Sequence, residues 1–368
     1  MYNPLISIHL KWSVLGVLIL LIHGCSTQEE RELTGASDLS SEFIAAADIS
    51  MFPEMRADSQ NFYDAEGNRK DLLEILTLNG INTIRLRLWV HPNSPHSGFE
   101  EVRAFSSELR EKGFKTWLTV HYSDTWADPG HQTVPQRWSN LSFTALKDSV
   151  LNYTRKVARD IRPDIIQIGN EINSGLLHPF GHRTANQAQF KNLLEIAISA
   201  VRSQSPNSRI MLHFAGISGS EDFLGEVNDL DFDLIGLSYY PMWHGKSLPQ
   251  LKNSLQTLSE IYARPVIIAE TAYPFTLNWN DWTNNIAGLD SHLILPEYPA
   301  SPDGQFQFLT DLKELIQEVN GGNGLCYWAP EWIAWKGPQA PDGSPWENQA
   351  LFDFEGKALP ALSVFKTN

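Results

Sequence analysis

Two glutamates stand directly after apolar runs that have the length of buried strands. The run Asp164-Ile-Ile-Gln-Ile-Gly leads into Asn170 and Glu171, and the run Val266-Ile-Ile-Ala leads into Glu270. Two carboxyl groups that face one site suit cleavage of a glycosidic bond, because one protonates the departing oxygen while the other attacks the anomeric carbon. One such glutamate is explained equally well as a carboxylate at the start of a helix. Two of them favour a catalytic pair.

Six further strand-like runs also end in polar or aromatic side chains. In a barrel of parallel strands the chemistry lies at the carboxyl ends of the strands, so we expect these side chains to surround the two glutamates. Arg85 and Arg87 alternate along one run and share a face, where an arginine can keep a carboxylate ionised. Tyr239 can do the same by donating a hydrogen bond. The residues at these ends are Asp48, Arg85, Arg87, Trp89, His121, Tyr122, Asp124, His213, Tyr239, Tyr240 and Trp328.

The strand-like runs alternate with amphipathic segments of helical period, which indicates βαβ units and a parallel sheet. Eight such units favour an α/β fold built as a single (β/α)8 TIM barrel over a doubly wound sheet, and no glycine-rich phosphate loop follows the first run. The expected strands are residues 43–48, 83–89, 116–121, 165–170, 209–214, 233–238, 266–270 and 324–328. The expected helices are residues 70–79, 100–112, 143–161, 186–203, 248–262 and 306–319.

Composition narrows the class of protein. The 368 residues are 42% hydrophobic and 11% aromatic, which excludes a disordered polymer, a collagen-like repeat and a disulfide mini-protein. A formal net charge of −15 repels phosphate backbones, so nucleic acid is not an expected partner. The 12 tryptophans suggest flat apolar faces offered to a ligand. The scattered histidines show no zinc-like spacing, so no metal is expected at the site.

The first residues read as a targeting segment. The apolar run Val14–Ile22 has the length of a signal-peptide core and is too short to span a membrane. It leads to Cys25 in a pattern that resembles a bacterial lipobox; a plain secretory signal with a chance cysteine is the alternative. We expect a lipoprotein signal peptide over residues 1–24, an acidic tether over 25–40 behind a lipidated Cys25, and one catalytic domain over 41–368.

This tether is similar to the export signals of surface lipoproteins, because the acidic stretch Glu29–Glu32 follows Cys25 closely. The expected location is therefore the outer membrane, with exposure at the cell surface and attachment through the lipid anchor on Cys25. We expect the protein itself to be a monomer.

Five longer motifs carry a family resemblance. With Glu171 and Glu270, they are similar to the arabinogalactan endo-β-1,4-galactanases of glycoside hydrolase family 53, over about residues 43–365. The strand endings alone occur throughout a larger clan of barrel glycosidases that includes cellulases and mannanases. The motifs are Asn82-Thr-Ile-Arg-Leu-Arg-Leu-Trp-Val90, His121-Tyr-Ser-Asp-Thr-Trp-Ala-Asp-Pro129, Gly169-Asn-Glu-Ile-Asn-Ser-Gly-Leu-Leu177, Gly236-Leu-Ser-Tyr-Tyr-Pro241 and Glu270-Thr-Ala-Tyr-Pro274.

The resemblance implies an endo-acting, retaining enzyme that cleaves the β-1,4-galactan side chains of pectin by double displacement, without a required cofactor. Glu171 would be the general acid/base and Glu270 the nucleophile. Arg85 would orient Glu270, Asn170 would hydrogen-bond the sugar 2-hydroxyl, and Tyr239 would lie beside the nucleophile. Trp328 would form the floor of the subsite for the cleaved sugar. The remaining residues of the cleft would be His121, Asp124 and Trp126.

Two segments depart from the family pattern. After the fifth strand, His213-Phe214-Ala215-Gly216 replaces an acidic/amide pair, and in Tyr327-Trp-Ala-Pro-Glu-Trp332 the acid is displaced. The family also implies a structural calcium ion near residues 274–303, although no regular aspartate spacing supports one here. Two alternative functions stay open: an endo-mannanase or cellulase, and a surface glycan-binding lipoprotein with an inactive site.

Overall fold

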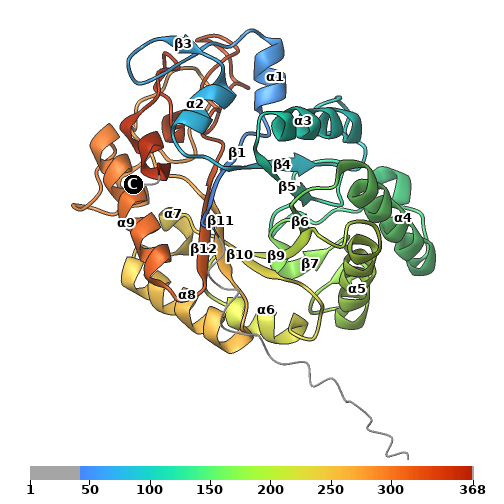
Figure 1. Cartoon of the computed structure of the whole chain (residues 1–368). Coiled ribbons are helices and arrows are strands. Elements are labelled where there is room, and N and C mark those ends of the chain that lie inside the picture. Colours follow the sequence, from blue (N-terminus) through green and yellow to red (C-terminus); the bar gives the residue numbers. More distant parts are fainter. Residues whose placement is uncertain (1–41, 367–368) are drawn as a thin grey trace, which may run out of the picture. The chain divides into compact units, whose positions relative to one another are not determined.

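Eight parallel strands close into a barrel, which confirms the expected (β/α)8 architecture (Figure 1). The computed structural model describes residues 42–366. Around the barrel the strands follow the order β1, β12, β11, β10, β9, β6, β5, β4, so the first strand pairs with the last. Their bounds are β1 (Ile44–Asp48), β4 (Thr83–Leu88), β5 (Lys115–Val120), β6 (Ile165–Ile168), β9 (Arg209–Ala215), β10 (Leu234–Ser238), β11 (Val266–Thr271) and β12 (Gly322–Trp328).

Helices surround this barrel on its outside (Figure 1). The α-helices are α1 (Phe52–Ala57), α2 (Leu72–Leu78), α3 (Phe99–Glu111), α4 (Phe143–Ile161), α5 (Gln187–Gln204), α6 (Ser220–Val227), α7 (Pro241–His244), α8 (Leu248–Tyr262) and α9 (Pro302–Glu318). Two short antiparallel pairs lie in loops: β2 (Phe62–Tyr63) with β3 (Arg69–Lys70), and β7 (Gly175–Leu176) with β8 (Gly181–His182). The 3₁₀ turns are η1 (Gln136–Trp138), η2 (Ile172–Ser174), η3 (Asp290–His292), η4 (Glu347–Gln349) and η5 (Pro360–Phe365).

Helix α4 illustrates how the sequence forms these outer helices. Leu146, Val150 and Val157 recur at helical spacing and are buried on one face. The side chain of Ser142 caps the first turn by accepting a backbone hydrogen bond, and the helix ends at Arg162, which takes a left-handed conformation. The buried face packs the helix on the barrel and leaves the carboxyl ends of the strands to the loops.

The inside of the barrel changes from apolar to polar along its axis. A small cluster of buried apolar residues, separate from the larger core that includes the helices, consists of Ile44, Ala46, Trp117, Ile165, Met211, Leu234, Ile267, Ala269 and Cys326. Alternate residues of a strand share a face, so the next inward positions on β6 and β9 are Gln167 and His213. Both side chains are completely buried. The polar layer that they form supports the residues at the barrel mouth.

The eight expected strands and six expected helices are all present, with ends that differ by up to four residues. The sequence did not indicate α6, because Ser220–Val227 makes only two turns and contains Gly225. The expected signal peptide (1–24) and tether (25–40) lie outside the described residues and stay predictions. Within residues 42–366, no helix is both long and apolar enough to cross a membrane.

Candidate active site

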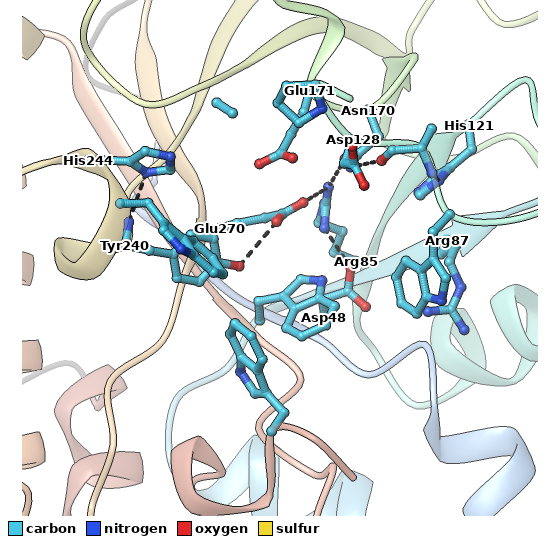
Figure 2. Close-up of a pocket in the computed structure, with 17 residues that line it drawn as sticks. Asp48, Arg85, Arg87, His121, Asp128, Asn170, Glu171, Tyr240, His244 and Glu270 are labelled. Atoms are coloured by element: carbon cyan, nitrogen blue, oxygen red, sulfur yellow. Dashed lines mark hydrogen bonds and ion pairs between the residues drawn. The ribbon is translucent and has the colours of Figure 1, made fainter. Parts of the chain in front are cut away.

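A cavity of about 440 Å³ opens at the carboxyl ends of the strands (Figure 2). Most of the residues that the sequence assigned to a site line this cavity. They are Arg85, His121, Trp126, Asn170, Glu171, Glu270 and Trp328. The other lining residues are Asp48, Arg87, Ala127, Asp128, Pro129, Ala215, Tyr240, Trp243, His244 and Trp346. The strand-end pattern in the sequence therefore predicted residues that lie together around one cavity.

Glu171 and Glu270 face each other across this cavity (Figure 2). A carboxylate oxygen of Glu171 lies within 4.8 Å of one of Glu270. Retaining glycosidases hold their two carboxyl groups about 5–5.5 Å apart, whereas inverting enzymes need about 6.5–9.5 Å to admit a water molecule. The short separation therefore fits direct attack on the sugar by one of the two carboxylates.

Glu270 accepts hydrogen bonds from two donors. Arg85 Nη2 donates to Glu270 Oε1 at 2.8 Å, and the Tyr240 hydroxyl donates to Glu270 Oε2 at 3.1 Å. Burial raises the pKa of Glu270, and the Arg85 guanidinium opposes that rise. Because both oxygens accept hydrogen bonds from protein donors, Glu270 has the fixed orientation that a nucleophile needs, and the Arg85 cation favours its ionised form.

Glu171 has the opposite character. Burial and the neighbouring Glu270 carboxylate raise the pKa of Glu171 to about 8, so the side chain is protonated at neutral pH. Its backbone is left-handed, with φ of 47°, a conformation that non-glycine residues adopt rarely. Gly169, two residues earlier, has φ of 76° and lies so close to Ile172 that a Cβ would be 2.5 Å from Ile172 Cγ2. The turn after β6 therefore requires this glycine to present Glu171 to the cavity.

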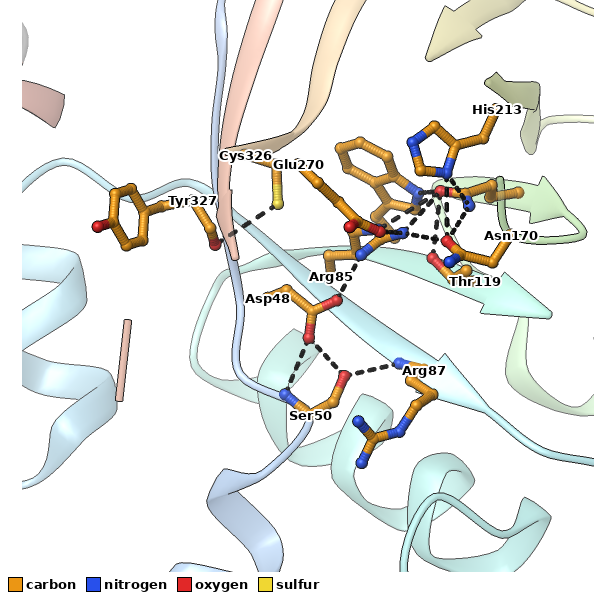
Figure 3. A network of polar contacts seen from close by, with 12 residues as sticks. Asp48, Ser50, Arg85, Arg87, Thr119, Asn170, His213, Glu270, Cys326 and Tyr327 are labelled. Carbon is orange, nitrogen blue, oxygen red and sulfur yellow. Dashed lines mark hydrogen bonds and ion pairs between the residues drawn. The ribbon is translucent and has the colours of Figure 1, made fainter. Parts of the chain in front are cut away.

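Arg85 connects several site residues (Figure 3). Besides Glu270, its guanidinium donates to Asp48 Oδ2 at 2.7 Å and to Asn170 Oδ1 at 2.9 Å. Burial opposes the charge of Arg85, but Glu270 and Asp48 raise its pKa above the ordinary value. The Asn170 amide nitrogen donates to Ala127 O at 2.9 Å. These contacts fix the Asn170 side chain at the cavity wall, where the amide nitrogen can donate to a sugar hydroxyl.

Tryptophans form the apolar walls of the cavity. The ring of Trp328 lies 4.7 Å from that of Trp346 and 5.8 Å from that of Trp126, measured between centroids. Trp126 is 37% exposed and Trp243 is 54% exposed. The Arg87 guanidinium lies 3.9 Å from the centre of the Trp126 ring, which orients this partly exposed side chain. Flat faces of this kind suit the C–H faces of sugars.

Two predicted site residues lie elsewhere. The Tyr239 hydroxyl donates to Gly245 O at 2.9 Å and does not line the cavity; the tyrosine beside Glu270 is Tyr240. Alternation along β10 explains the correction, because Tyr240 shares the inward face and Tyr239 points away. Asp124 also does not line the cavity; its carboxylate accepts from the backbone nitrogens of His91 and Gln136 and joins two loops.

The two departures from the family pattern have different consequences. Ala215 lines the cavity with a methyl group, which leaves space beside Glu171. The displaced acid, Glu331, is completely buried and accepts from the Met51 backbone nitrogen at 3.1 Å, outside the cavity. The sequence also left Asp128 and Trp243 without a role, because Asp128 lies in a loop and Trp243 in the four-residue helix α7, where no periodic pattern marks them.

One group of potential metal ligands occurs among the described residues, namely Glu171, His213 and Glu270. The histidine in this group is already engaged at both nitrogens. His213 Nδ1 accepts from the Glu171 backbone nitrogen at 3.3 Å, and Nε2 lies 3.0 Å from Ser238 Oγ. The imidazole therefore has no free lone pair for a metal ion, and the group is better described as the catalytic pair with its support.

A closed barrel of parallel strands, with two closely spaced carboxyl groups at its mouth, defines a (β/α)8 glycoside hydrolase of the retaining class. Comparison with known families agrees with this class. The chain belongs to glycosyl hydrolase family 53, whose family model matches residues 44–365.

Individual relatives cover nearly the whole domain. An arabinogalactan endo-β-1,4-galactanase of Cellvibrio japonicus is 33% identical over 355 residues, which is 91% of this chain and 93% of the relative. The solved GH53 catalytic domain of Ignisphaera aggregans is 38% identical, with a TM-score of 0.84 over 88% of this chain and 96% of that one. A solved fungal β-1,4-galactanase is 31% identical, with a TM-score of 0.75 over 88% of this chain and 99% of that one.

Proposed function

We propose that this protein is an endo-acting β-1,4-galactanase that cleaves galactan side chains of pectin with retention of configuration. The observation that carries the proposal is the close pair of Glu171 and Glu270, of which Glu171 is the more readily protonated and Glu270 is paired with Arg85, in an open cavity lined by tryptophans. The choice of galactan is supported by the relatives named as galactanases, which are similar over nearly the whole domain.

The geometry supports a double displacement. In the first step the Glu270 carboxylate forms a bond to the anomeric carbon while the glycosidic C–O bond breaks and Glu171 gives its proton to the leaving oxygen. In the second step the Glu171 carboxylate takes a proton from water, and the water oxygen displaces Glu270 from the same carbon. Two inversions restore the original configuration. Asn170 and Arg85 hold the sugar and the nucleophile in place during both steps.

Hydrolysis of linear β-1,4-galactan, measured as new reducing ends, tests the proposal. The wild type is expected to release intermediate oligomers before short ones, whereas Glu171→Ala and Glu270→Ala are expected to be inactive. Glu226→Ala, which removes an ion pair with Arg183 outside the cavity, serves as the matched control and should retain activity. Activity that survives Glu270→Ala would refute the assignment.

Azide separates the two catalytic roles. With an activated aryl galactobioside, azide should restore turnover of both variants by filling the space of the lost carboxylate. Glu270→Ala should then give the α-galactosyl azide after one inversion, and Glu171→Ala should give the β-galactosyl azide after two. If Glu270→Ala instead gave the β-galactosyl azide and Glu171→Ala the α-galactosyl azide, the roles of the two glutamates would be exchanged.

Parallel assays on mannan and cellulose test the alternatives from the same clan, which predict higher activity on those polymers than on galactan. A glycan-binding protein with an inactive site would retain galactan without forming new reducing ends. The buried, paired state of both glutamates favours an enzyme, because binding alone does not need an acid and a nucleophile at this spacing.

We also propose that the protein is an outer-membrane lipoprotein, attached through Cys25 and exposed at the cell surface, and that it acts as a monomer. The lipobox-like sequence supports the anchor. Cys25→Ala should move the full-length protein from the membrane fraction to the soluble fraction, and protease treatment of intact cells should remove the wild type from the surface. If Cys25→Ala remained in the membrane fraction as the wild type does, the lipid anchor would be excluded.

Catalysis needs no cofactor in this proposal, because both reacting groups are side chains. A structural calcium ion, however, fits the segment after β11. Asp281 Oδ2, Asn285 Oδ1 and Glu347 Oε2 are buried and have no hydrogen-bond partner within residues 42–366. Asn280 N and Asn285 Nδ2 both donate to the other oxygen of Glu347, so these side chains belong to one region. Oxygen donors of this kind suit calcium.

Gly343 lies against this region so closely that a Cβ would be 2.0 Å from Asp281 Oδ2. We propose that Asp281, Asn285 and Glu347 hold the ion, which would neutralise buried carboxylates and stabilise the loop. Calcium should raise the Tm of the EDTA-treated wild type but not that of Asp281→Asn. An equal Tm with and without calcium would refute the site.

A further inference from the structure

His213 contacts the backbone of Glu171 directly and is linked to its carboxyl group through Ser238. The Glu171 backbone nitrogen donates to His213 Nδ1 at 3.3 Å. On the other side of the ring, His213 Nε2 lies 3.0 Å from Ser238 Oγ, and Ser238 Oγ donates to Glu171 Oε1 at 2.5 Å. All three residues are buried. The left-handed backbone of Glu171 is what allows one imidazole to reach both groups.

The direction of these hydrogen bonds follows from the donors around His213 Nδ1. The Glu171 backbone N–H points at this nitrogen, and Gln167 Nε2 lies 2.9 Å from it. The orientation of the Gln167 amide is fixed, because its oxygen accepts from Arg85, Trp117 and Thr119. The two Gln167 amide hydrogens also have Gly169 O and Asn170 Oδ1 as acceptors, each at 3.0 Å, so the Glu171 N–H is the donor that decides. This donor leaves Nδ1 as an acceptor, so the proton of the neutral ring lies on Nε2.

One contact favours the other tautomer. His213 Nδ1 also lies 3.2 Å from Asn170 Oδ1, which could accept a proton from it. That oxygen already accepts from Arg85 Nη2 at 2.9 Å and from Gln167 Nε2 at 3.0 Å. A proton on Nδ1 would also point at the hydrogen of the Glu171 backbone N–H, which is an unfavourable contact between two donors. The contacts of Nδ1 thus favour the tautomer with its proton on Nε2.

This tautomer orients the Ser238 hydroxyl. His213 Nε2–H donates to Ser238 Oγ, so the serine hydrogen is free to point to Glu171 Oε1. Because Glu171 Oε1 accepts the hydrogen bond from Ser238, the acidic proton of Glu171 is less favourable on this oxygen than on the other carboxyl oxygen. Within residues 42–366 no group hydrogen-bonds Glu171 Oε2, and this oxygen is not among the buried unpartnered atoms. Oε2 is therefore the oxygen open to the cavity.

We propose that His213 and Ser238 are positioning residues that keep the catalytic proton of Glu171 on Oε2, where it faces the departing sugar oxygen. The inference rests on the proposed function and deepens it, because it assigns the geometry of the acid step. Burial and the nearby Arg85 lower the pKa of His213 well below its usual range, so the ring stays neutral and the direction of the hydrogen bonds is constant. The charged and titratable groups that act on Glu171 are Glu270, Arg85, Asp128 and Tyr240.

Ser238→Ala tests the role kinetically. On galactan, whose leaving group must be protonated, kcat should fall about tenfold, which is part of the roughly 10²–10⁴-fold effect of general acid catalysis. On 2,4-dinitrophenyl galactobioside, whose leaving group needs no proton, formation of the glycosyl-enzyme should stay within about threefold of the wild type. Because the Ser238 hydrogen bond lowers the pKa of Glu171, its loss should also move the alkaline limb of the pH profile to higher pH.

Ser259→Ala is the matched control, because Ser259 is equally buried but lies in α8 outside the cavity. It should change neither the ratio between the two substrates nor the pH profile. If Ser238→Ala lowers the rates on both substrates by the same factor, and leaves the alkaline limb in place, the serine has only a structural role and the proposal is wrong.

The tautomer can be measured without any substrate. In the full-length protein labelled with ¹⁵N-histidine, the His213 ring should carry its proton on Nε2 at neutral pH, with the signal assigned by its loss in His213→Gln. A proton on Nδ1 would overturn the proposal. This measurement also separates two failures: a wild type that does not cleave galactan refutes the proposed function, whereas the wrong tautomer refutes only the positioning role.

Discussion

The guanidinium of Arg85 donates to the carboxylate of Glu270 across 2.8 Å, and both side chains are almost completely buried. The same guanidinium forms a second buried ion pair with Asp48 at 2.7 Å. One cation thus balances two carboxylates inside the barrel. Because water is excluded, the loss of Arg85 leaves two buried carboxylates uncompensated, so this arginine matters for stability as well as for catalysis.

Arg85→Met should therefore lower both kcat and stability. Without the cation, Glu270 and Asp48 repel each other, Glu270 binds a proton more readily, and less of the nucleophile is ionised at neutral pH. We expect a loss of about 10²-fold in kcat and of about 3–5 kcal/mol in the free energy of unfolding. Steady-state kinetics and urea unfolding measure the two effects. A kcat within twofold of the wild type would contradict the role of Arg85.

The pH dependence of activity should reflect the pKa of Glu171. The first step needs the protonated acid, so its rate should fall as the pH rises through about 8. A profile of kcat/KM on galactan measures this limb. In contrast, dinitrophenyl galactobioside needs no acid and should keep its rate above that pH. If the rates on both substrates showed the same alkaline limb, this limb would reflect the titration of a group other than Glu171.

Stability should change over the same range of pH. Folding raises the pKa of Glu171 from 4.5 to about 8, so the folded chain binds this proton more tightly than the unfolded chain does. The resulting stabilisation is complete below pH 4.5 and is lost as the pH rises to about 8. Glu171→Gln removes this contribution, so its Tm should fall less than that of the wild type between pH 5 and 8. Parallel Tm curves would contradict the raised pKa.

The two neighbouring tyrosines offer a matched comparison. Tyr240→Phe removes a donor to Glu270 and should lower kcat about tenfold, as expected for a hydrogen bond to a charged group. Tyr239→Phe removes a hydrogen bond to Gly245 O and should cost only about 1 kcal/mol of stability. Kinetics and thermal unfolding of both variants test the assignment. A larger loss of kcat in Tyr239→Phe would restore the prediction made from the sequence.

Trp126 should contribute to binding more than to chemistry. Trp126→Ala is expected to raise KM for galactan about fivefold with little change in kcat, because it removes an aromatic contact worth about 1 kcal/mol. Arg87→Met, which frees the Trp126 ring, should have a smaller effect of the same kind. Trp282→Ala, which removes a more exposed tryptophan outside the cavity, is the control. An unchanged KM in Trp126→Ala would exclude the platform.

The sequence predicted the barrel and the catalytic pair for one physical reason. An apolar strand that ends in a carboxylate is unusual, and the fold brings all such ends to one face of the barrel. Glu171, which follows β6 closely, and Glu270 in β11 carry this signal, and Arg85 lies within β4 as a charged residue between apolar neighbours. Loop residues such as Asp124 and Asp128 carry none, because their side-chain directions depend on contacts between distant segments.

The period-two alternation of side chains along the strands could have predicted that Ser238 and His213 face the inside of the barrel. Leu234, Ser238 and Tyr240 lie at even spacing along β10, and Leu234 belongs to the apolar cluster inside the barrel. Period-two alternation therefore places Ser238 and Tyr240 inside and Tyr239 outside. The direction of the His213 hydrogen bonds, in contrast, depends on Gln167 and on the turn at Glu171, which no local pattern reveals.

The pairing of β1 with β12 determines when the enzyme can first work. Asp48 and Trp328 are partners in that pairing, and Asp48 also holds Arg85. A nascent chain that has been synthesised only to residue 321 already contains both glutamates, but its ring of strands is still open between β1 and β11. We therefore expect catalytic competence only after the final strand has closed the barrel, so that fragments that end earlier do not hydrolyse the polysaccharide.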